Sequence, residues 1–190
     1  LERASHSIDG IDVILVSDYG KGVVSRGLIE GLQALAGGRQ IPIAVDPKIG
    51  NFSCYKGVDI LTPNNDEASS YCRFVIEGDK SLINAGHMLL DELLCGAVLI
   101  TRGKNGMSLF EKGGSVTHIP AVAKEVYDVT GAGDTVIATL TLGIAAGLDL
   151  PSSAIMANFA GGIVVGKVGT STVSPNELKA AILNYGAKGN

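Results

Sequence analysis

The sequence contains few of the residues that build metal sites or disulfide frameworks. Its 190 residues include three cysteines, three histidines and no tryptophan. The cysteines, Cys54, Cys72 and Cys95, are odd in number and form no C-x-x-C pair. This pattern argues against a disulfide framework and against a zinc site, and it fits a reducing compartment.

Basic tracts and long apolar runs are also missing. The net charge is −4, and no tract of consecutive basic residues could neutralise nucleic-acid phosphates. The nearest approach to a membrane span, residues 136–148, falls short of the ~20 apolar residues required. The N-terminal residues lack the charged start and apolar middle of a signal peptide. We therefore expect a cytoplasmic protein with neither a nucleic-acid nor a membrane partner.

Glycine, by contrast, is abundant. The 26 glycines are about twice the usual ~7 % share, which indicates many tight turns and close backbone approaches. Hydrophobic residues make up 46 %, an ordinary globular composition. The length suits one domain with a core, so we expect a single domain over residues 1–190.

Short apolar segments alternate with amphipathic ones along the first part of the chain. Ser25 caps an expected helix that ends at Gly37-Gly38. The patterns predict strands at residues 13–16, 41–45, 58–61 and 97–101, helices at 65–72 and 81–94, a hairpin of 107–110 with 115–119, and helices at 133–146, 152–167 and 176–183.

This alternation predicts the α/β class, with a mainly parallel sheet covered on both faces. Ligands of such sheets bind at the carboxyl ends of the strands. Polar residues gather at those ends here, in segments 17–22, 46–48, 64–67 and 101–103.

The strongest motif is residues 128–134, Asp-Val-Thr-Gly-Ala-Gly-Asp. Gly131 and Gly133 open a long apolar helix, so free N–H groups and the positive end of the helix dipole form a cradle for an anion. Asp134 on the first turn is a proton acceptor beside that anion. An alternative remains equally open on spacing alone: Asp134 improves the electrostatics of the first turn, and the glycines only turn the chain.

Two other phosphate-loop patterns fail. A dinucleotide fingerprint that starts at Gly131 requires glycine where Val136 stands. The run of residues 161–168 has Val168 where a Walker loop needs Ser or Thr, and no strand precedes it.

Four ordered segments resemble the ribokinase-like (PfkB-type) sugar kinases. Residues 62–67 resemble the T-P-N-x-x-E segment of that family, and residues 101–107 its T-R-G-x-x-G segment. Residues 128–134 resemble its D-x-T-G-A-G-D signature, and residues 160–170 its C-terminal nucleotide wall. The resemblance implies a ribokinase-like three-layer sandwich that uses ATP and Mg²⁺.

Further segments are similar to one group in that family, the heptose-phosphate kinases, which are often fused to an adenylyltransferase. These segments are residues 17–22, 46–48, 125–130 and 164–175. The group contributes to the ADP-heptose precursor of bacterial lipopolysaccharide. The resemblance thus implies transfer of the γ-phosphate of ATP to the anomeric hydroxyl of D-glycero-D-manno-heptose 7-phosphate.

The resemblance also implies roles for single residues at the helix N-terminus. Asp134 would accept the proton of the attacking sugar hydroxyl. The N–H groups of Gly131, Ala132 and Gly133 would form an anion hole for the phosphoryl oxygens.

Other residues would bind magnesium and nucleotide. Asn64 and Glu67 would organise Mg²⁺ through water, although the same two residues could simply form a capping box. The phosphates of the nucleotide would be lined by Thr101, Arg102 and Gly103, and its adenine by Asn158, Gly162 and Lys167. Four residues at strand ends could contact the sugar phosphate or ATP, with turn formation an equal alternative: Asp18, Lys21, Asp46 and Lys48.

The chain is shorter than the roughly 300 residues of a full ribokinase-like domain. We expect it to be the C-terminal, nucleotide-binding part, without the lid and first strands. Their absence exposes a sheet edge, so we expect the chain to self-associate through that edge or to need its missing half to be soluble. Whether it is active alone stays open. The alternatives are another sugar or nucleoside kinase of the family, and a nucleotide-binding module without catalysis.

Overall fold

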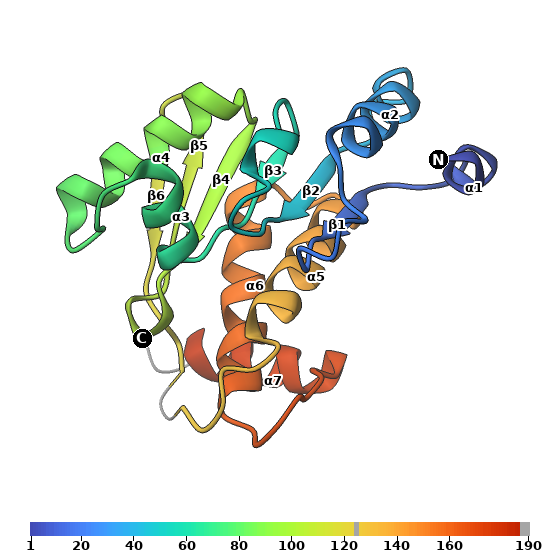
Figure 1. Ribbon diagram of the computed structural model, residues 1–190. Coiled ribbons are helices and arrows are strands. Elements are labelled where there is room, and N and C mark those ends of the chain that lie inside the picture. The colour runs from blue at the N-terminus through green and yellow to red at the C-terminus, as the bar shows by residue number, and fades with distance from the viewer. Residues whose placement is uncertain (124–125, 187–190) are drawn as a thin grey trace. The chain divides into compact units, whose positions relative to one another are not determined.

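The computed structural model describes residues 1–123 and 126–186 (Figure 1). The chain divides into two compact units. The first contains Leu1–Thr101 and Ser108–Thr117, and the second contains Arg102–Met107 and His118–Asn190. The expectation of one domain over the whole chain stays a prediction.

A six-stranded sheet runs in the order β1-β2-β3-β4-β5-β6. Its strands are β1 (Ile14–Ser17), β2 (Ile43–Asp46), β3 (Ile60–Leu61), β4 (Ala97–Thr101), β5 (Met107–Glu111) and β6 (Val116–Ile119). Strands β1 to β4 are parallel, with Val16 opposite Val45 and Val45 opposite Leu61. The prediction of a mainly parallel sheet is therefore confirmed.

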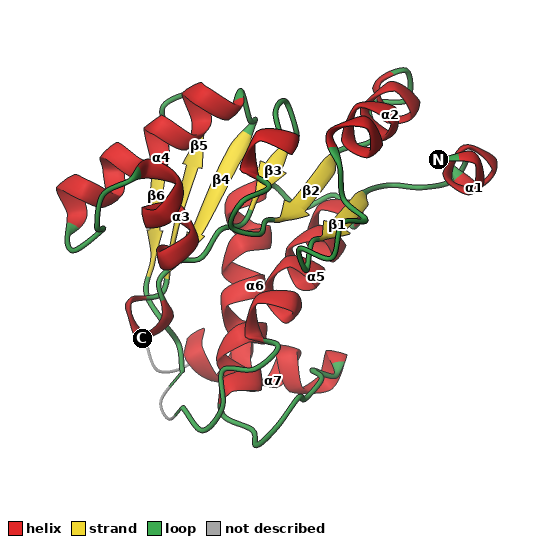
Figure 2. Ribbon diagram, in the orientation of Figure 1, coloured by secondary structure: helices red, strands yellow, loops and turns green. Residues whose placement is uncertain are grey.

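The last two strands form the predicted hairpin (Figure 2). The link of residues 102–106 between β4 and β5 is shorter than the dozen or so residues that a parallel crossover needs. The turn of the hairpin, between β5 and β6, closes with a hydrogen bond from the N–H of Glu111 to the carbonyl of Ser115. Gly114 adopts a φ of 88° within this turn.

Three helices of the first unit share one core with the sheet. They are α2 (Arg26–Gly37), α3 (Asn65–Cys72) and α4 (Asp79–Leu93). The core joins buried residues of all three helices to one face of the strands: Ile29, Leu32, Ala68, Cys72, Leu82, Leu89, Ile43, Val45, Leu61, Val98 and Ile100. Gly86 lets α4 approach β5, because a Cβ there would lie 2.5 Å from the ring of Phe110.

The second unit is helical, with α5 (Ala132–Ala145), α6 (Leu150–Val165) and α7 (Pro175–Gly186). Glycines bring α5 and α6 together at two places. A Cβ on Gly143 of α5 would lie 2.7 Å from Ser153 Oγ, and one on Gly161 of α6 would lie 3.0 Å from Val136. The two helices therefore run antiparallel and pack through small residues.

The structure departs from the sequence prediction in its shortest elements. Strand β3 has only Ile60 and Leu61, although residues 58–61 were predicted. The N–H of Val58 instead donates to the carbonyl of Tyr55 in the preceding turn, and the carbonyl of Val58 accepts from the N–H of Gly96. Helix α1 (Glu2–Ser7) buries no residue and has no side-chain cap, so no apolar periodicity signals it. Two 3₁₀ turns, Phe52–Cys54 and Gly103–Asn105, were also not predicted.

Strand β1 lies at one edge of the sheet, and Leu15 on it is 39 % exposed. Self-association through this edge stays a prediction. Over residues 1–123 and 126–186, every helix is too short or too polar to cross a bilayer.

Candidate functional site

The N-terminus of α5 is shaped by Gly131, which caps the helix in the left-handed region at a φ of 78°. Helical bonding starts with the N–H of Thr135, which donates to the carbonyl of Gly131 at 3.0 Å. The N–H groups of the first turn, including that of Gly133, have no acceptor within a helix. The expected anion hole included the N–H of Ala132, but in the structure this N–H donates to the carbonyl of Val129 at 3.1 Å.

Asp134 lies on this first turn, and its side chain is exposed. The surface around the turn is open, since a Cβ added at Gly131 or Gly133 would meet no atom within 4 Å. A carboxylate and backbone donors thus share one accessible helix end, which suits an anionic ligand with a proton to lose.

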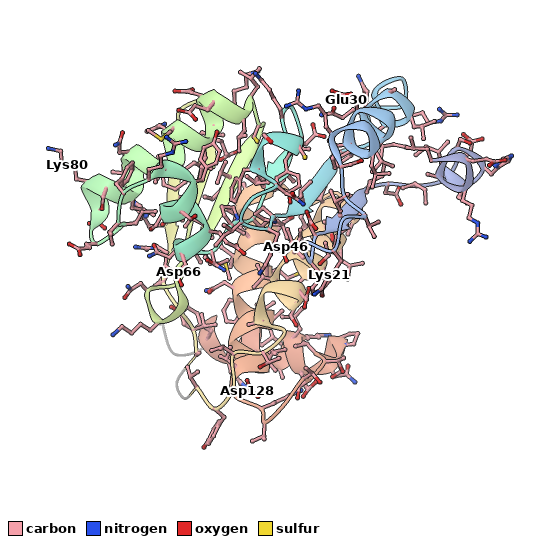
Figure 3. All side chains as sticks on the ribbon, in the orientation of Figure 1. Lys21, Glu30, Asp46, Asp66, Lys80 and Asp128 are labelled. Carbon is pink, nitrogen blue, oxygen red and sulfur yellow. The ribbon has the colours of Figure 1, made fainter. Side chains whose placement is uncertain are left out.

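Asp128 holds the segment before α5 in place. One carboxylate oxygen accepts from the N–H of Thr130 at 2.9 Å, and the other accepts from the N–H of Gly169 at 3.2 Å. These hydrogen bonds, that from Thr130 first, hold the pKa of Asp128 below its usual range. Asp128, labelled in Figure 3, therefore stays ionised and ties the signature segment to the loop that follows α6.

A cavity of about 500 Å³ lies in the same unit, between α6, α7 and the segment before α5. Its walls are mainly apolar: Val122, Ala123, Phe159, Gly162, Ile163, Ala181, Asn184 and Tyr185. Phe159 and Tyr185 meet edge to face, with ring centroids 5.3 Å apart. The size and walls of the cavity suit a flat, largely apolar group such as a nucleobase.

Of the three residues predicted to border the adenine, Gly162 lines this cavity. A Cβ there would lie 2.7 Å from a methyl of Val122, so glycine is required where α6 meets that segment. Asn158 instead is buried and donates its amide to the carbonyl of Pro120 at 2.8 Å. Phe159, Asn184 and Tyr185 were missed, because apolar periodicity on α6 and α7 does not distinguish a pocket wall from a core.

Lys167 is likewise held by internal partners. Its ammonium lies 2.6 Å from Glu177 Oε1 and donates to the carbonyl of Thr172. The hydrogen bond from Lys167, followed by those from Ser174, lowers the pKa of Glu177 to about 2. The pair anchors the start of α7 to the end of α6.

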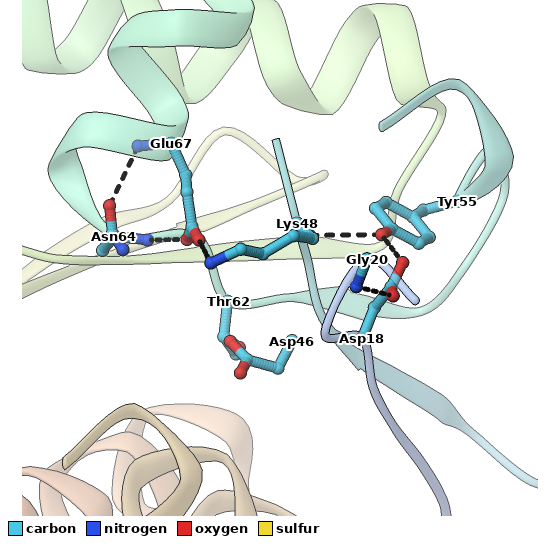
Figure 4. Close-up of polar contacts among 8 residues, drawn as sticks. All are labelled: Asp18, Gly20, Asp46, Lys48, Tyr55, Thr62, Asn64 and Glu67. Atoms are coloured by element: carbon cyan, nitrogen blue, oxygen red, sulfur yellow. Dashed lines mark hydrogen bonds and ion pairs between the residues drawn. The ribbon is translucent and has the colours of Figure 1, made fainter. Parts of the chain in front are cut away.

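In the first unit, Asn64 and Glu67 form the capping box that was one of the two predictions for them. The side chain of Asn64 accepts from the N–H of Glu67 at 2.9 Å, and Glu67 Oε2 accepts from the N–H of Asn64 at 3.0 Å. Glu67 Oε1 lies outside the box, 3.9 Å from the ammonium of Lys48 (Figure 4). Capping therefore leaves one buried carboxylate oxygen for another partner.

The capping box leaves magnesium one carboxylate oxygen, Oε1 of Glu67. Among the described residues, no group of three or more His, Cys, Asp and Glu side chains could hold a metal. Magnesium releases its waters reluctantly and commonly takes one or two carboxylates plus the phosphates of its substrate. One available carboxylate oxygen on Glu67 fits that arrangement.

Asp18 lies at the end of β1 and is 5 % exposed. Its carboxylate accepts from the N–H of Gly20 at 2.7 Å, the amide of Asn51 at 2.8 Å and the hydroxyl of Tyr55 at 2.5 Å. The structure thus places Asp18 in an internal network. Neither Asn51 nor Tyr55 was predicted for this site.

The other residues predicted at strand ends are more accessible. Lys21 is exposed, and Asp46 is half-buried at the end of β2 (Figure 3). The hydroxyl of Thr62 lies 3.5 Å from Asp46 Oδ1, and the carbonyl of Asp46 accepts from the N–H of Asp18. The structure therefore gathers these side chains at the carboxyl ends of β1 and β2, as expected for such a sheet.

Thr101 ends β4 beside the capping box, where it forms a parallel bridge with Asn64. Its N–H donates to the carbonyl of Pro63 at 3.0 Å. Arg102 and Gly103 belong to the second unit, and Gly103 has a φ of 54°. Within the described part of the chain, the Nε of Arg102 is buried without a hydrogen-bond partner.

Comparison with protein families and with curated proteins gives a consistent result. The profile of the pfkB family carbohydrate kinases matches residues 16–177. The bifunctional protein HldE of Geobacter sulfurreducens is 49 % identical over 174 residues, which cover 92 % of this chain and 36 % of that protein. The protein of the same name from Pseudomonas entomophila is 45 % identical over 181 residues, or 95 % of this chain and 38 % of that protein.

Solved structures share the fold. Arabidopsis thaliana ribokinase complexed with ribose and ATP superposes with a TM-score of 0.82 at 19 % identity, over 96 % of this chain and 59 % of that one. Phosphofructokinase-2 from Escherichia coli in complex with potassium also superposes with a TM-score of 0.82, at 17 % identity, over 96 % of this chain and 60 % of that one. The predicted ribokinase-like fold is confirmed, and the chain spans little more than a third of the first curated relative, 36 %.

Proposed function

This chain belongs to the pfkB family of carbohydrate kinases, and from that premise we propose that it carries the nucleotide-binding and catalytic part of an ATP-dependent sugar kinase. The observation that supports this most strongly is the N-terminus of α5. There Gly131 turns the chain at a positive φ, and Asp134 stands exposed on the first turn. Backbone donors and a base at one helix end are the groups that phosphoryl transfer to an alcohol requires.

Asp134 is the general base in this proposal. Its carboxylate takes the proton of the sugar hydroxyl while the hydroxyl oxygen forms a bond to the γ-phosphorus of ATP. The bond from that phosphorus to the bridging oxygen breaks, and ADP leaves with the electron pair. An ordinary ionised carboxylate suffices, because such reactions depend on positioning and charge stabilisation.

The N–H groups of the first turn of α5 stabilise the charge that spreads over the transferring phosphoryl oxygens. Gly131 and Gly133 are the residues that leave room for these oxygens, since their surroundings are open. Ala132 has its N–H committed to Val129, so the anion hole relies on its neighbours and on the helix dipole. Thr101, Arg102 and Gly103 would line the phosphates.

The nucleobase occupies the cavity lined by Phe159, Gly162 and Tyr185. Asn64 and Glu67 would hold magnesium through water, with the Oε1 of Glu67 that lies outside the capping box as the acceptor. Magnesium, when bound, neutralises negative charge on the phosphate oxygens. The backbone of Asn64 and Glu67 is fixed by their capping box, so both side chains are held in place before nucleotide arrives.

The proposed acceptor is the anomeric hydroxyl of D-glycero-D-manno-heptose 7-phosphate, a step toward ADP-heptose and lipopolysaccharide. The similarity of residues 17–22, 46–48 and 164–175 to heptose-phosphate kinases supports this choice. The proteins named HldE align over the same part of the chain. A cytoplasmic location follows from such a reaction, because ATP is its phosphoryl donor.

Turnover with a panel of acceptors tests the proposal. ADP release would be measured with Mg²⁺ and heptose 7-phosphate, ribose, fructose 6-phosphate or adenosine, and phosphorus NMR would locate the transferred group. We expect turnover that depends on heptose 7-phosphate and a product phosphorylated at the anomeric oxygen. Turnover with another acceptor would favour a different sugar or nucleoside kinase. Nucleotide binding without any turnover would favour a binding module without catalysis.

A further inference from the structure

A buried tyrosine lies under the polar residues at the carboxyl ends of β1 and β2. Tyr55 follows the 3₁₀ turn Phe52–Cys54 and is fully buried. Its hydroxyl donates to Asp18 Oδ2 at 2.5 Å (Figure 4). The two residues lie 37 positions apart, so this bond joins the loop after β1 to the loop after β2.

Asp18 is ionised at neutral pH. Burial alone would raise the pKa of Asp18, but hydrogen bonds from Asn51, Tyr55 and Gly20 outweigh burial and lower it. Burial first, and then the hydrogen bond to Asp18, raises the pKa of Tyr55. The pair is therefore a carboxylate that accepts from a phenol, and neither group changes its proton near pH 7.

The same hydroxyl also holds the backbone of Lys48. It accepts from the N–H of Lys48 at 3.2 Å, while the carboxylate of Asp18 accepts from the N–H of Gly20. Gly20 in turn adjoins the stem of Lys48, since a Cβ on Gly20 would lie 3.3 Å from Lys48 Cγ. Asp18 and Tyr55 thus constrain Lys48 at its backbone and along its side chain.

The far end of Lys48 remains accessible. Its side chain runs from Tyr55 toward α3 and is 51 % exposed, with the ammonium 3.9 Å from Glu67 Oε1 (Figure 4). A salt bridge this long and exposed contributes little to stability. The ammonium is therefore able to bind an anion beside the carboxylate that is proposed to organise magnesium.

We propose that Tyr55 is a positioning residue for phosphate binding: with Asp18, it orients Lys48 so that the lysine ammonium meets a phosphate of the magnesium–nucleoside triphosphate next to Glu67. The inference rests on the proposed function, because it assumes that nucleotide phosphates reach this edge. A lysine side chain loses much rotamer freedom when it is immobilised, so a backbone and stem fixed in advance lower the entropic cost of binding.

Calorimetric titration of the full 190-residue chain with MgATP tests this, with adenosine as a probe that has no phosphate. The variants are Tyr55→Phe, Lys48→Met and their combination. Tyr71→Phe is the matched control, because Tyr71 also donates its hydroxyl to a carboxylate, that of Glu92, and its hydroxyl makes no bond to Lys48. We expect Tyr55→Phe to raise the Kd for MgATP about fivefold, the effect of losing one hydrogen bond.

Three further results are expected. Tyr55→Phe changes the Kd for MgATP less than about twofold when Lys48→Met is already present, because the hydroxyl acts through the lysine. Adenosine binding does not change, and Tyr71→Phe behaves like the wild type. If Tyr55→Phe fails to fold, Asp18→Asn takes its place in the same cycle, with the same expected dependence on Lys48.

The outcomes separate this inference from the proposed function. Folded wild-type chain that does not bind MgATP contradicts the proposed function and the inference with it. MgATP binding that Tyr55→Phe leaves unchanged overturns the inference alone. So does an equal loss of affinity with and without Lys48→Met, since the hydroxyl would then only stabilise the fold.

Discussion

At the carboxyl ends of β1 and β2, polar side chains bond to one another, whereas at the N-terminus of α5 the backbone turns at Gly131 and the acid that follows is exposed. Asp18 in the first region accepts three hydrogen bonds and is buried. Asp134 in the second is exposed on a first helical turn. The first region is held by side-chain hydrogen bonds, and the second is shaped by the positive φ of Gly131.

The difference suits two steps of one reaction. Side chains fixed by mutual hydrogen bonds can bind charge that is present throughout, such as a nucleotide phosphate and its magnesium ion. Under the proposed function, the exposed carboxylate of Asp134 acts as a base on a hydroxyl that arrives and leaves. Changes in the second region should therefore alter the rate, and changes in the first should alter binding and stability.

The largest effect should follow from Asp134→Asn. Loss of the proposed general base should lower kcat by about 10²–10⁴-fold, with little change in the Kd for MgATP. Single-turnover phosphoryl transfer and calorimetry would measure both. Asp79→Asn, which changes a first-turn acid of α4, is the control and should be neutral. If Asp134→Asn lowers the rate only modestly, and no more than Asp79→Asn does, then Asp134 stabilises its helix and is not the base.

Gly133→Ala should separate activity from stability. Gly133 lies in the helical region with open space around it, so alanine should stabilise α5 by about 0.5–1 kcal/mol. The added methyl would intrude on the phosphoryl oxygens and lower kcat on the order of 10- to 100-fold. Urea unfolding and turnover would be compared on the same sample. If rate and stability both rise, the glycine has no role in the anion hole.

Asn64→Ala tests whether the capping box also serves magnesium. Loss of the cap should cost about 1 kcal/mol of unfolding free energy. Ser25→Ala is the matched control, because Ser25 caps α2 through the N–H of Leu28 at 3.3 Å. Both variants should be destabilised alike, but only Asn64→Ala should raise the magnesium concentration needed for half-maximal turnover. An unchanged magnesium requirement would leave Asn64 with capping alone.

The smallest effect concerns Glu177→Gln and is visible mainly through pH. The pKa of Glu177 is about 2 in the folded chain against the ordinary 4.5, so its contribution is present above pH 4.5. Stability from this group is lost as pH falls toward 2. The wild type should have the higher Tm at pH 7, and the gap to Glu177→Gln should narrow as pH falls from 4.5 toward 2. A difference in Tm that does not change with pH would mean that the charge interaction between Glu177 and Lys167 is not its cause.

Local patterns in the sequence predicted most of the fold. Helix α3 begins and ends at the predicted residues because a capping box needs only residues three apart. The parallel sheet followed from short β-branched runs between helices. Helix α1 could not be predicted, because it buries nothing that would give a period.

The candidate site was predictable where it depends on a short motif. Residues 128–134 could be identified from their own sequence, because the two glycines and the acid that follows them lie within seven residues. The bond between Asp18 and Tyr55 spans 37 positions, and that between Asn158 and Pro120 spans 38. Such contacts depend on how distant segments pack, and no local pattern records them.

Backbone amide NMR of the labelled chain, titrated with a non-hydrolysable MgATP analogue, would show where the nucleotide sits. The largest shifts should occur at Gly131 and Gly133, whose N–H groups are proposed to meet the phosphates, and at Gly162 in the apolar cavity. Saturable shifts confined to other residues, such as the separate cavity lined by Tyr71 and Glu92, would contradict a phosphate site at the N-terminus of α5.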